Sequence, residues 1–241
     1  MKKIVTIVLA LGLISFASAQ NKKNTSKFSV DGPGDHLLLQ LSIDNWKGAP
    51  DSISSHIKGL SRGLNFAVML NKPFKGNPHF SVAFGVGVSS SNIFFKNMSI
   101  NLKTPGTLLP FNSLDTTNRF KKYKLATAFL EIPVELRYTF NPEKPKKTWK
   151  IAVGAKVGTM LNAHTKGKTL QNVFGYTLNN GLIEKTTKKI FFNTTRLVAT
   201  ARVGMGNFSL FGAYQITPFF KDGVGGADIR PYQIGLCLSG L

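Results

Sequence analysis

Two glutamates stand out as side chains that could do chemistry. Glu131 and Glu135 lie four residues apart in a segment where apolar residues alternate with them. A period of two is the pattern of a β-strand, and it places residues i and i+4 on the same face. Two enclosed carboxylates could act as general acid and base. More often, such charges form a neutralised ion cluster, because a buried carboxylate without a partner is strongly destabilising.

Basic residues at equivalent positions favour the ion cluster. If Phe140 pairs with Trp149 across the turn 141–148, Lys156 falls opposite Pro133 and lies diagonally between the two glutamates. Arg137, Arg196 and Arg202 are expected to point into the same interior. We therefore predict a neutralising plug rather than a catalytic pair, made of Glu131, Glu135, Arg137, Lys156, Arg196 and Arg202.

Other catalytic or binding motifs are missing from the sequence. The four histidines are scattered, without the spacing of metal ligands, and no Gly-x-Ser-x-Gly motif occurs. Two Gly-x-Gly segments lack the third glycine and the strand–helix context of a nucleotide loop. Cys237 has no second cysteine with which to form an internal disulfide and is interpreted as a small interior residue. We expect no cofactor, no metal and no enzymatic activity.

Alternating segments predict the elements that position these charges. Each predicted strand has one face of large apolar residues, as in Phe80, Val82, Phe84 and Val86. The eight segments are 37–44, 63–70, 80–89, about 123–140, 149–158, 196–204, 208–216 and 232–239. Pro133 lacks an N–H group, which predicts a local bulge or kink in the fourth strand.

The connections alternate in length. Short ones are expected at 71–78, 141–148 and Gly206-Asn207, and the last is a hairpin signal because glycine provides the positive φ of a type II′ turn. Long ones are expected at 47–59, 90–122, 164–190 and 218–230. Short turns at one end and long loops at the other are typical of outer-membrane barrels, with the short turns in the periplasm. The fold class predicted is all-β, an eight-stranded antiparallel up-and-down transmembrane β-barrel.

The composition of the polar face decides which side is enclosed. A soluble barrel would bury its apolar face and expose Lys, Glu and Thr on the other. Here the second face carries glycine, alanine and serine, as in Ser81, Ala83, Gly85 and Gly87. Small residues fit a narrow eight-stranded interior, so we place this face inside and the apolar face against lipid. The alternative of a soluble, exported ligand-binding barrel is tested by fractionation.

Aromatic residues on the apolar face gather beside the short turns. This is the position of an interfacial girdle at the periplasmic side of a membrane barrel. Core aromatics of a β-sandwich are the alternative, but they would not explain the clustering at one end. The predicted interface aromatics are Phe80, Tyr138, Phe140, Trp149 and Phe208.

The N-terminus predicts export. Lys2 and Lys3 precede an apolar run, 4–16, and Ala17-Ser18-Ala19 has the small residues of a cleavage site. An uncleaved anchor is the alternative, although the run is shorter than the ~20 residues of a spanning helix. We predict a signal peptide at 1–19, a linker at 20–35 and a barrel domain at 36–241.

The charge is strongly basic, with 31 Lys and Arg against 11 Asp and Glu. Export and the lack of interleaved aromatics argue against nucleic acid as the partner. An anionic surface outside the cytoplasm fits better, and we expect outer-membrane lipid and lipopolysaccharide as partners, with the barrel-assembly machinery needed for insertion. The lysine-rich segments 121–122, 166–168 and 185–189 are either solvated or in contact with lipopolysaccharide phosphates.

Two segments carry a family resemblance. The stretch from Phe129 to Phe140, FLEIPVELRYTF, resembles a strand of the PorT-like outer-membrane β-barrel family common in Bacteroidetes, with Phe129 in place of the usual tyrosine. The segments 214–223 and 230–236 resemble its C-terminal part. The resemblance implies an eight-stranded outer-membrane barrel, and some relatives take part in type IX protein secretion.

Four functions are compatible with these observations. The first is a non-enzymatic outer-membrane barrel with a plugged polar lumen, which contributes to envelope structure or binds through its long loops. The second is a PorT-like accessory component of a type IX secretion system, which gene neighbourhood and co-purification would distinguish. A lipid-modifying barrel enzyme would need a His/Ser/Asp set that we do not find, and the soluble ligand-binding barrel is the fourth. We expect the first.

Overall fold

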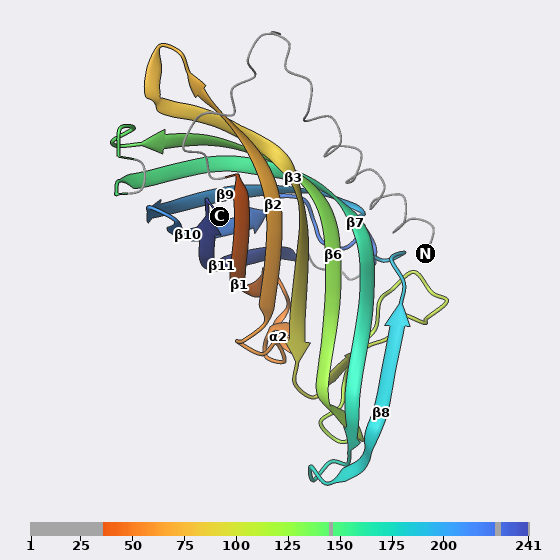
Figure 1. Ribbon diagram of the computed structural model, residues 1–241. Coiled ribbons are helices and arrows are strands. Elements are labelled where there is room, and N and C mark those ends of the chain that lie inside the picture. The colour runs from red at the N-terminus through yellow and green to blue at the C-terminus, as the bar shows by residue number, and fades with distance from the viewer. Residues whose placement is uncertain (1–35, 145–146, 225–227, 241) are drawn as a thin grey trace, which may run out of the picture. The chain divides into compact units, whose positions relative to one another are not determined.

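We describe a computed structural model of the chain, in which residues 36–144, 147–224 and 228–240 are described. The predicted signal peptide, 1–19, and the predicted linker, 20–35, lie outside the described residues. In the described part, no helix is long and apolar enough to cross a membrane. Strands dominate the fold (Figure 1): β1 Leu37–Lys47, β2 Arg62–Phe74, β3 Asn77–Phe95, β4 Met98–Ile100, β5 Phe111–Ser113, β6 Arg119–Thr139, β7 Trp149–Gln171, β8 Thr177–Thr187, β9 Thr195–Met205, β10 Phe208–Gln215 and β11 Arg230–Ser239, with one short helix, α2 Asp51–Ser54.

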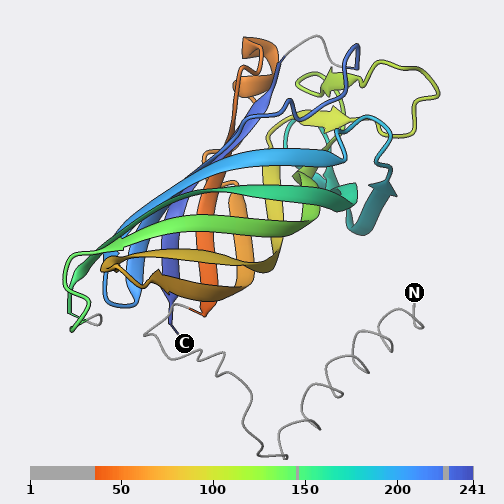
Figure 2. The ribbon, with the colours of Figure 1, turned by 90° about the horizontal axis from the view of Figure 1, so that it is seen from above.

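Eight of these strands form a closed antiparallel ring. The order is β1, β2, β3, β6, β7, β9, β10 and β11, and the ring closes where β11 pairs with β1 from Leu38 opposite Ser239 to Lys47 opposite Arg230. Figure 2 shows the ring from a direction turned by 90°. Strand β8 extends the sheet beside β7, and β4 and β5 form a separate two-stranded hairpin. The predicted eight-stranded up-and-down barrel is confirmed.

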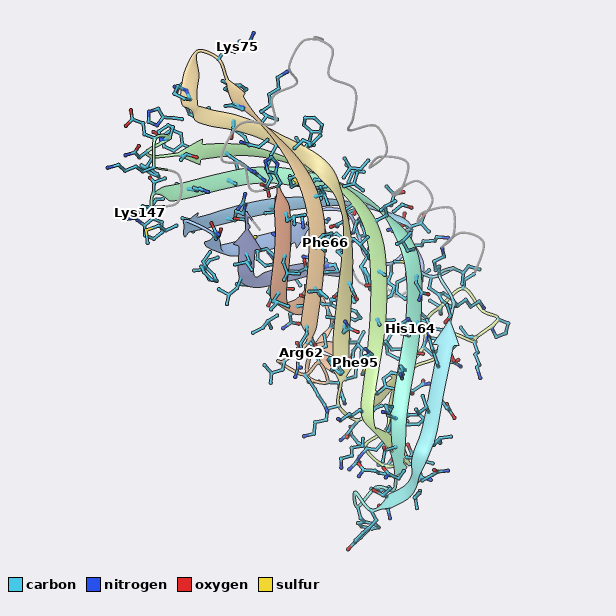
Figure 3. All side chains as sticks on the ribbon, viewed as in Figure 1. Arg62, Phe66, Lys75, Phe95, Lys147 and His164 are labelled. Atoms are coloured by element: carbon cyan, nitrogen blue, oxygen red, sulfur yellow. The ribbon has the colours of Figure 1, made fainter. Side chains whose placement is uncertain are left out.

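The two ends of the barrel differ, as predicted. At one end, which we call the turn end, the shorter connections join β2 to β3, β6 to β7 and β9 to β10. Gly206 in the last of these has φ +61°, as its predicted turn requires. The long connections lie at the opposite loop end. Figure 3 shows Lys75 and Lys147 at the turn end, and Arg62, Phe95 and His164 toward the loop end.

The exposure of side chains agrees with the predicted orientation of the two faces. Large apolar residues are exposed on the outer wall, such as Leu41 at 58% and Ile132 at 58%. Polar residues at alternate positions are buried inside, such as Ser42 at 7% and Glu131 at 4%. An apolar outer wall around a polar interior is the reverse of a soluble barrel and suits insertion into lipid.

Two predicted long connections are wrong in extent, because strands continue into them. β3 runs on to Phe95, β6 begins at Arg119, and β7 reaches Gln171 before β8 returns beside it. In these extensions the faces change polarity: inward residues such as Ile93 are apolar and buried, and outward residues such as Lys122 and Lys168 are polar. Because the two faces exchange polarity along the strand, a search for one constant alternation of apolar and polar residues does not detect the continuation.

The predicted bulge at Pro133 is also wrong. The register of β6 is the same on both sides of Pro133, opposite β3 and opposite β7. Towards β3, the paired residues stop at Val134 and resume at Glu131, so the ladder is interrupted without an inserted residue. The register shift between β6 and β7 lies instead between Ala128 and Phe129. A missing N–H costs one ladder bond, and here the sheet accommodates the gap without a shift.

Candidate functional site: the charged lumen and the apolar cap

The lumen near the turn end holds one ion cluster. The Glu135 carboxylate, 4% exposed, accepts hydrogen bonds from Arg137 Nε at 2.9 Å and Arg202 Nη2 at 3.1 Å. Arg137 and Arg202 both lie opposite Ala152 of the intervening strand β7. Because Ala152 has a small side chain, the two long side chains can meet above it. Two guanidinium groups therefore neutralise this glutamate.

A second ion cluster, around Glu131, lies four residues along β6 from Glu135 toward the loop end. Glu131 Oε1 accepts a hydrogen bond from Arg196 Nε at 3.0 Å, and Lys156 Nζ lies 3.7 Å from Glu131 Oε2. Arg196 also donates to the Ser89 hydroxyl, and its guanidinium lies 3.6 Å from the Phe129 ring centroid. Arg196 thus joins the charged lumen to the apolar region above it.

Gly158 explains how Glu131 and Arg196 meet. In the register, Gly158 of β7 lies between Glu131 on β6 and Arg196 on β9. A Cβ at position 158 would lie 3.0 Å from Glu131 Cγ and 3.5 Å from Arg196 Cγ. A larger side chain would occupy the space through which the two charged groups approach. The small residues of the inner face therefore serve the ion pairs as well as the narrow lumen.

The structure corrects one expectation for Lys156. It lies opposite Pro133 as predicted. Its ion pair is with Glu131 alone among the described residues, and its other bond is to Gln40 Oε1 at 3.3 Å. Glu135, the second glutamate predicted to lie within its reach, is instead held by the two arginines. The register fixes the Cα positions, but the long Lys156 side chain can reach either of the two diagonal glutamates, so the register alone does not decide which one it pairs with.

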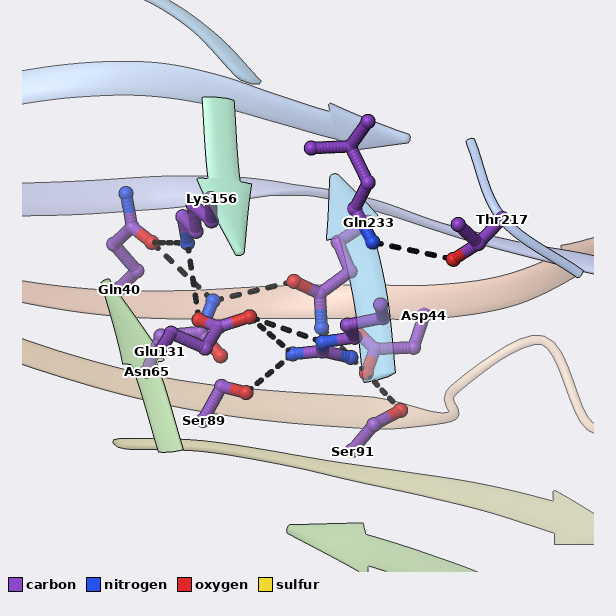
Figure 4. A network of polar contacts seen from close by, with 11 residues as sticks. Gln40, Asp44, Asn65, Ser89, Ser91, Glu131, Lys156, Thr217 and Gln233 are labelled. Atoms are coloured by element: carbon purple, nitrogen blue, oxygen red, sulfur yellow. Dashed lines mark hydrogen bonds and ion pairs between the residues drawn. The ribbon is translucent and has the colours of Figure 1, made fainter. Parts of the chain in front are cut away.

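Polar residues that the sequence prediction omitted extend the Glu131 cluster across the barrel (Figure 4). Asn65 Nδ2 lies 3.2 Å from both Gln40 Oε1 and Gln233 Oε1, and Gln233 Nε2 donates to Asp44 Oδ2 at 3.0 Å. Asp44 also accepts hydrogen bonds from Ser42 and Ser91. Sequence reasoning could have identified these residues, because they occupy the alternate strand positions that face the interior.

The lumen has little free space. The cavity beside Glu131, Lys156 and Asp44 measures about 20 Å³, and the one beside Arg137 and Arg202 about 30 Å³. Such volumes hold one or two waters. The carboxylates of Glu131, Glu135 and Asp44 are occupied by cations, hydroxyls or amides. This arrangement suits charge neutralisation at Glu131 and Glu135.

An apolar cap, not predicted from the sequence, covers the loop end of the lumen. Trp46 lies at its centre, with ring centroids 5.5 Å from Phe219, 5.7 Å from Phe95 and 5.8 Å from Phe220. The signal was present as Phe-Phe pairs at 94–95, 191–192 and 219–220. Its buried members come from the strand extensions and the long connections: Trp46, Ile53, Ile93, Phe95, Met98, Ile100, Leu102, Leu109, Tyr123, Leu125, Phe129, Met160, Ala163, Phe191, Phe192, Phe219, Phe220, Val224 and Ile229.

Polar contacts tie the long connections to one another. Asn193 Nδ2 donates to the carbonyl oxygens of Pro218 at 2.9 Å and Phe220 at 2.8 Å. Within the connection from β3 to β6, Asp115 accepts hydrogen bonds from Asn97 Nδ2 and Ser113 Oγ, and these bonds hold the pKa of its exposed carboxyl below the usual range. The long connections form a packed lid with specific contacts.

The five predicted interface aromatics all lie at the turn end on the outer wall. The Tyr138 ring centroid is 4.9 Å from that of Phe80 and 5.1 Å from that of Phe140. Trp149 and Phe208, 56% and 70% exposed, flank Met205 in the register. Contact of this group with a membrane interface stays a prediction.

Comparison with known proteins agrees with this architecture. A family described as "Outer membrane protein beta-barrel domain" matches residues 18–221. Among solved structures, Ail, the attachment invasion locus protein of Yersinia pestis, is similar at 12% identity and a TM-score of 0.32, over 84% of this chain and 94% of Ail. A TM-score this low supports no inference about function. A search of curated protein sequences gives no significant match.

Proposed function

Since the chain belongs to the outer-membrane β-barrel domain family, we propose that it is a non-enzymatic outer-membrane protein with a plugged lumen. In this proposal the barrel contributes to envelope structure or binds partners through its loop end. The observation that carries it is the continuous filling of the interior. The ion cluster of Glu135, the ion cluster of Glu131 and the apolar cap follow one another from the turn end to the loop end.

A filled lumen predicts that the barrel does not act as a diffusion pore. In an eight-stranded barrel, side chains suffice to occupy the interior. The cavities beside the lumen charges, of about 20, 30 and 10 Å³, are of water size. We expect the purified full chain to migrate differently in detergent gels before and after heating, as a closed barrel does. We expect no stable ion-conducting steps when it is inserted into planar bilayers.

Two measurements can overturn this proposal separately. Long-lived conducting steps from the full chain would contradict the plug. Recovery of the protein from cells in the soluble fraction, as a monomer without amphiphiles, would contradict membrane insertion itself. The predicted partners, outer-membrane lipid, lipopolysaccharide and the barrel-assembly machinery, are part of this proposal, because each follows from insertion into that membrane.

The alternative function is that of a PorT-like accessory component of a type IX secretion system. It is supported by the resemblance of the segment from Phe129 to Phe140 and of the C-terminal segments. Affinity purification of the tagged full chain from the native envelope tests it. Recovery of stoichiometric secretion subunits would favour this role, and their absence from an otherwise intact membrane preparation would count against it.

A further inference from the structure

Lysines gather on the outward face of the strand extensions. Lys124 of β6 lies directly opposite Lys166 of β7, which lies directly opposite Lys185 of β8. In the adjacent row of the sheet, Lys122 lies opposite Lys168. Three separate stretches of sequence are thus brought into one group by strand pairing. We call these five residues the lysine patch.

This clustering is unfavourable without an anion. Cβ atoms directly opposite in an antiparallel pair are about 5 Å apart, and like charges at that spacing destabilise the sheet. Within the described part of the chain, no carboxylate forms an ion pair with the five lysines. Glu184 lies opposite Gly167, an inward position, and therefore on the other face of the hairpin.

The patch is partly ordered. Lys124 Nζ donates to Asn92 Oδ1 at 2.6 Å and lies 5.7 Å from the Phe94 ring centroid, both on the neighbouring strand β3. Its ammonium group is therefore held in place next to Lys166. Preorganised cations bind an anion at a lower entropic cost than freely rotating ones. Lysines that are simply hydrated would not need an ammonium group fixed in this way.

The position of the patch relative to lipid follows from the change of polarity along β6 and β7. Towards the turn end, the outward residues are mostly exposed and apolar, up to Leu130 on β6 and, except for Thr159, up to Leu161 on β7. Lys166 follows Leu161 by five residues, roughly 16 Å along a strand. At a tilt of about 40°, this corresponds to about 12 Å of height above the apolar band. Lysine stems extend toward the interface, so the patch is at headgroup level.

We propose that the lysine patch binds the phosphate groups of a membrane glycolipid whose acyl chains cover the apolar wall of β6 and β7 below it. This deepens the proposed function and rests on it, because the patch meets headgroups only if the barrel is inserted. Phosphate is the favoured anion because several ammonium groups can each donate to its oxygens. A lipid is favoured over a soluble polyanion because the patch continues the lipid-facing wall upward on the same strands.

Native mass spectrometry of the full chain in nonionic detergent tests the proposal. The probe is bisphosphorylated lipid A, compared with the same lipid after removal of its phosphates. The test variant carries Lys124→Gln, Lys166→Gln and Lys185→Gln. The control variant carries Lys75→Gln, Lys144→Gln and Lys147→Gln, which make the same change in charge at the turn end.

We expect the test variant to bind the lipid about 100-fold more weakly, from roughly fivefold per lysine at a phosphate-bearing surface. The control variant keeps the affinity of the wild type. A second variant, Lys122→Gln with Lys168→Gln, loses about 25-fold on the same basis. Heat-modifiable migration of all variants shows that the barrel is intact.

Three results would overturn the proposal while leaving the proposed function in place. The first is equal lipid binding by the test variant and the wild type. The second is equal binding of the dephosphorylated and the bisphosphorylated lipid to the wild type. The third is displacement of the lipid by inorganic phosphate, or by a soluble sulfated polysaccharide that binds more tightly than the lipid. If the wild type instead fails to insert into bilayers, the proposed function fails with it.

Discussion

Replacing Arg196 by methionine tests whether the lumen charges stabilise the barrel. Arg196 is 7% exposed and forms the shortest ion pair to Glu131, with further contacts to Ser89 and the Phe129 ring. The methionine keeps much of the volume but removes the cation. Glu131 would then depend on Lys156, whose Nζ is 3.7 Å away and is shared with Gln40.

The expected loss is large, because an uncompensated carboxylate remains in a closed interior. Removing one partner of a buried ion pair costs about 3–5 kcal/mol. For a domain of this size, 1 kcal/mol shifts the midpoint of unfolding by roughly 2–4 °C. Arg196→Met should therefore lower the temperature of the gel-shift transition in detergent by about 6–20 °C.

A double variant separates the charge effect from loss of packing. Adding Glu131→Gln to Arg196→Met removes the stranded anion, so we expect much of the stability to return, with a coupling of about 2 kcal/mol between the two sites. Arg62→Met is the matched control, because Arg62 is exposed on the outer wall and should change stability by less than about 0.5 kcal/mol. If Arg196→Met behaves like this control, or if the two substitutions are additive, the lumen charges do not act as a neutralising plug.

Further substitutions test other parts of the structure. Lys156→Met should cost only about 1–2 kcal/mol in detergent unfolding, since Glu131 keeps Arg196, and a loss as large as that of Arg196→Met would contradict this assignment of partners. Gly158→Val should destabilise as strongly as Arg196→Met by separating Glu131 from Arg196, and unchanged melting would refute the role of that glycine. Gly235→Val should prevent closure of β11 on β1, because a Cβ there would lie 1.9 Å from the Leu41 carbonyl oxygen; a normal heat-modifiable band would argue against this seam. Phe192→Ala should cost about 3–5 kcal/mol in the cap and speed proteolysis of the long connections while the barrel stays closed; unchanged proteolysis would show that the cap does not hold them.

Local patterns sufficed for the strands and their orientation. Successive side chains of a strand point to opposite sides, so alternation in segments such as 80–88 reports both the element and the chemistry of its two faces. The pairing of Phe140 with Trp149 also followed from a single turn, and their backbone hydrogen bond is present. These features depend on neighbours in sequence, which is why they could be predicted.

The partners of the lumen charges depended on the tertiary structure. Arg196 and Glu131 are 65 residues apart, and only the pairing of β6, β7 and β9 places both beside Gly158. The choice of Lys156 between two glutamates was decided by side-chain packing after the register was set. The sequence therefore identified the charged set but assigned one contact wrongly.

The sequence by itself determined eight alternating segments, the small-residue face that is enclosed and the short turns that join them. The tertiary structure alone decided the strand extensions, the apolar cap and the lysine patch. In each of these, residues from different segments meet through strand pairing or side-chain packing, as Lys124 meets Lys166 and Lys185 by strand pairing. Contacts between different segments carry no local periodicity, so they exist only once the strands have paired and the connections have packed.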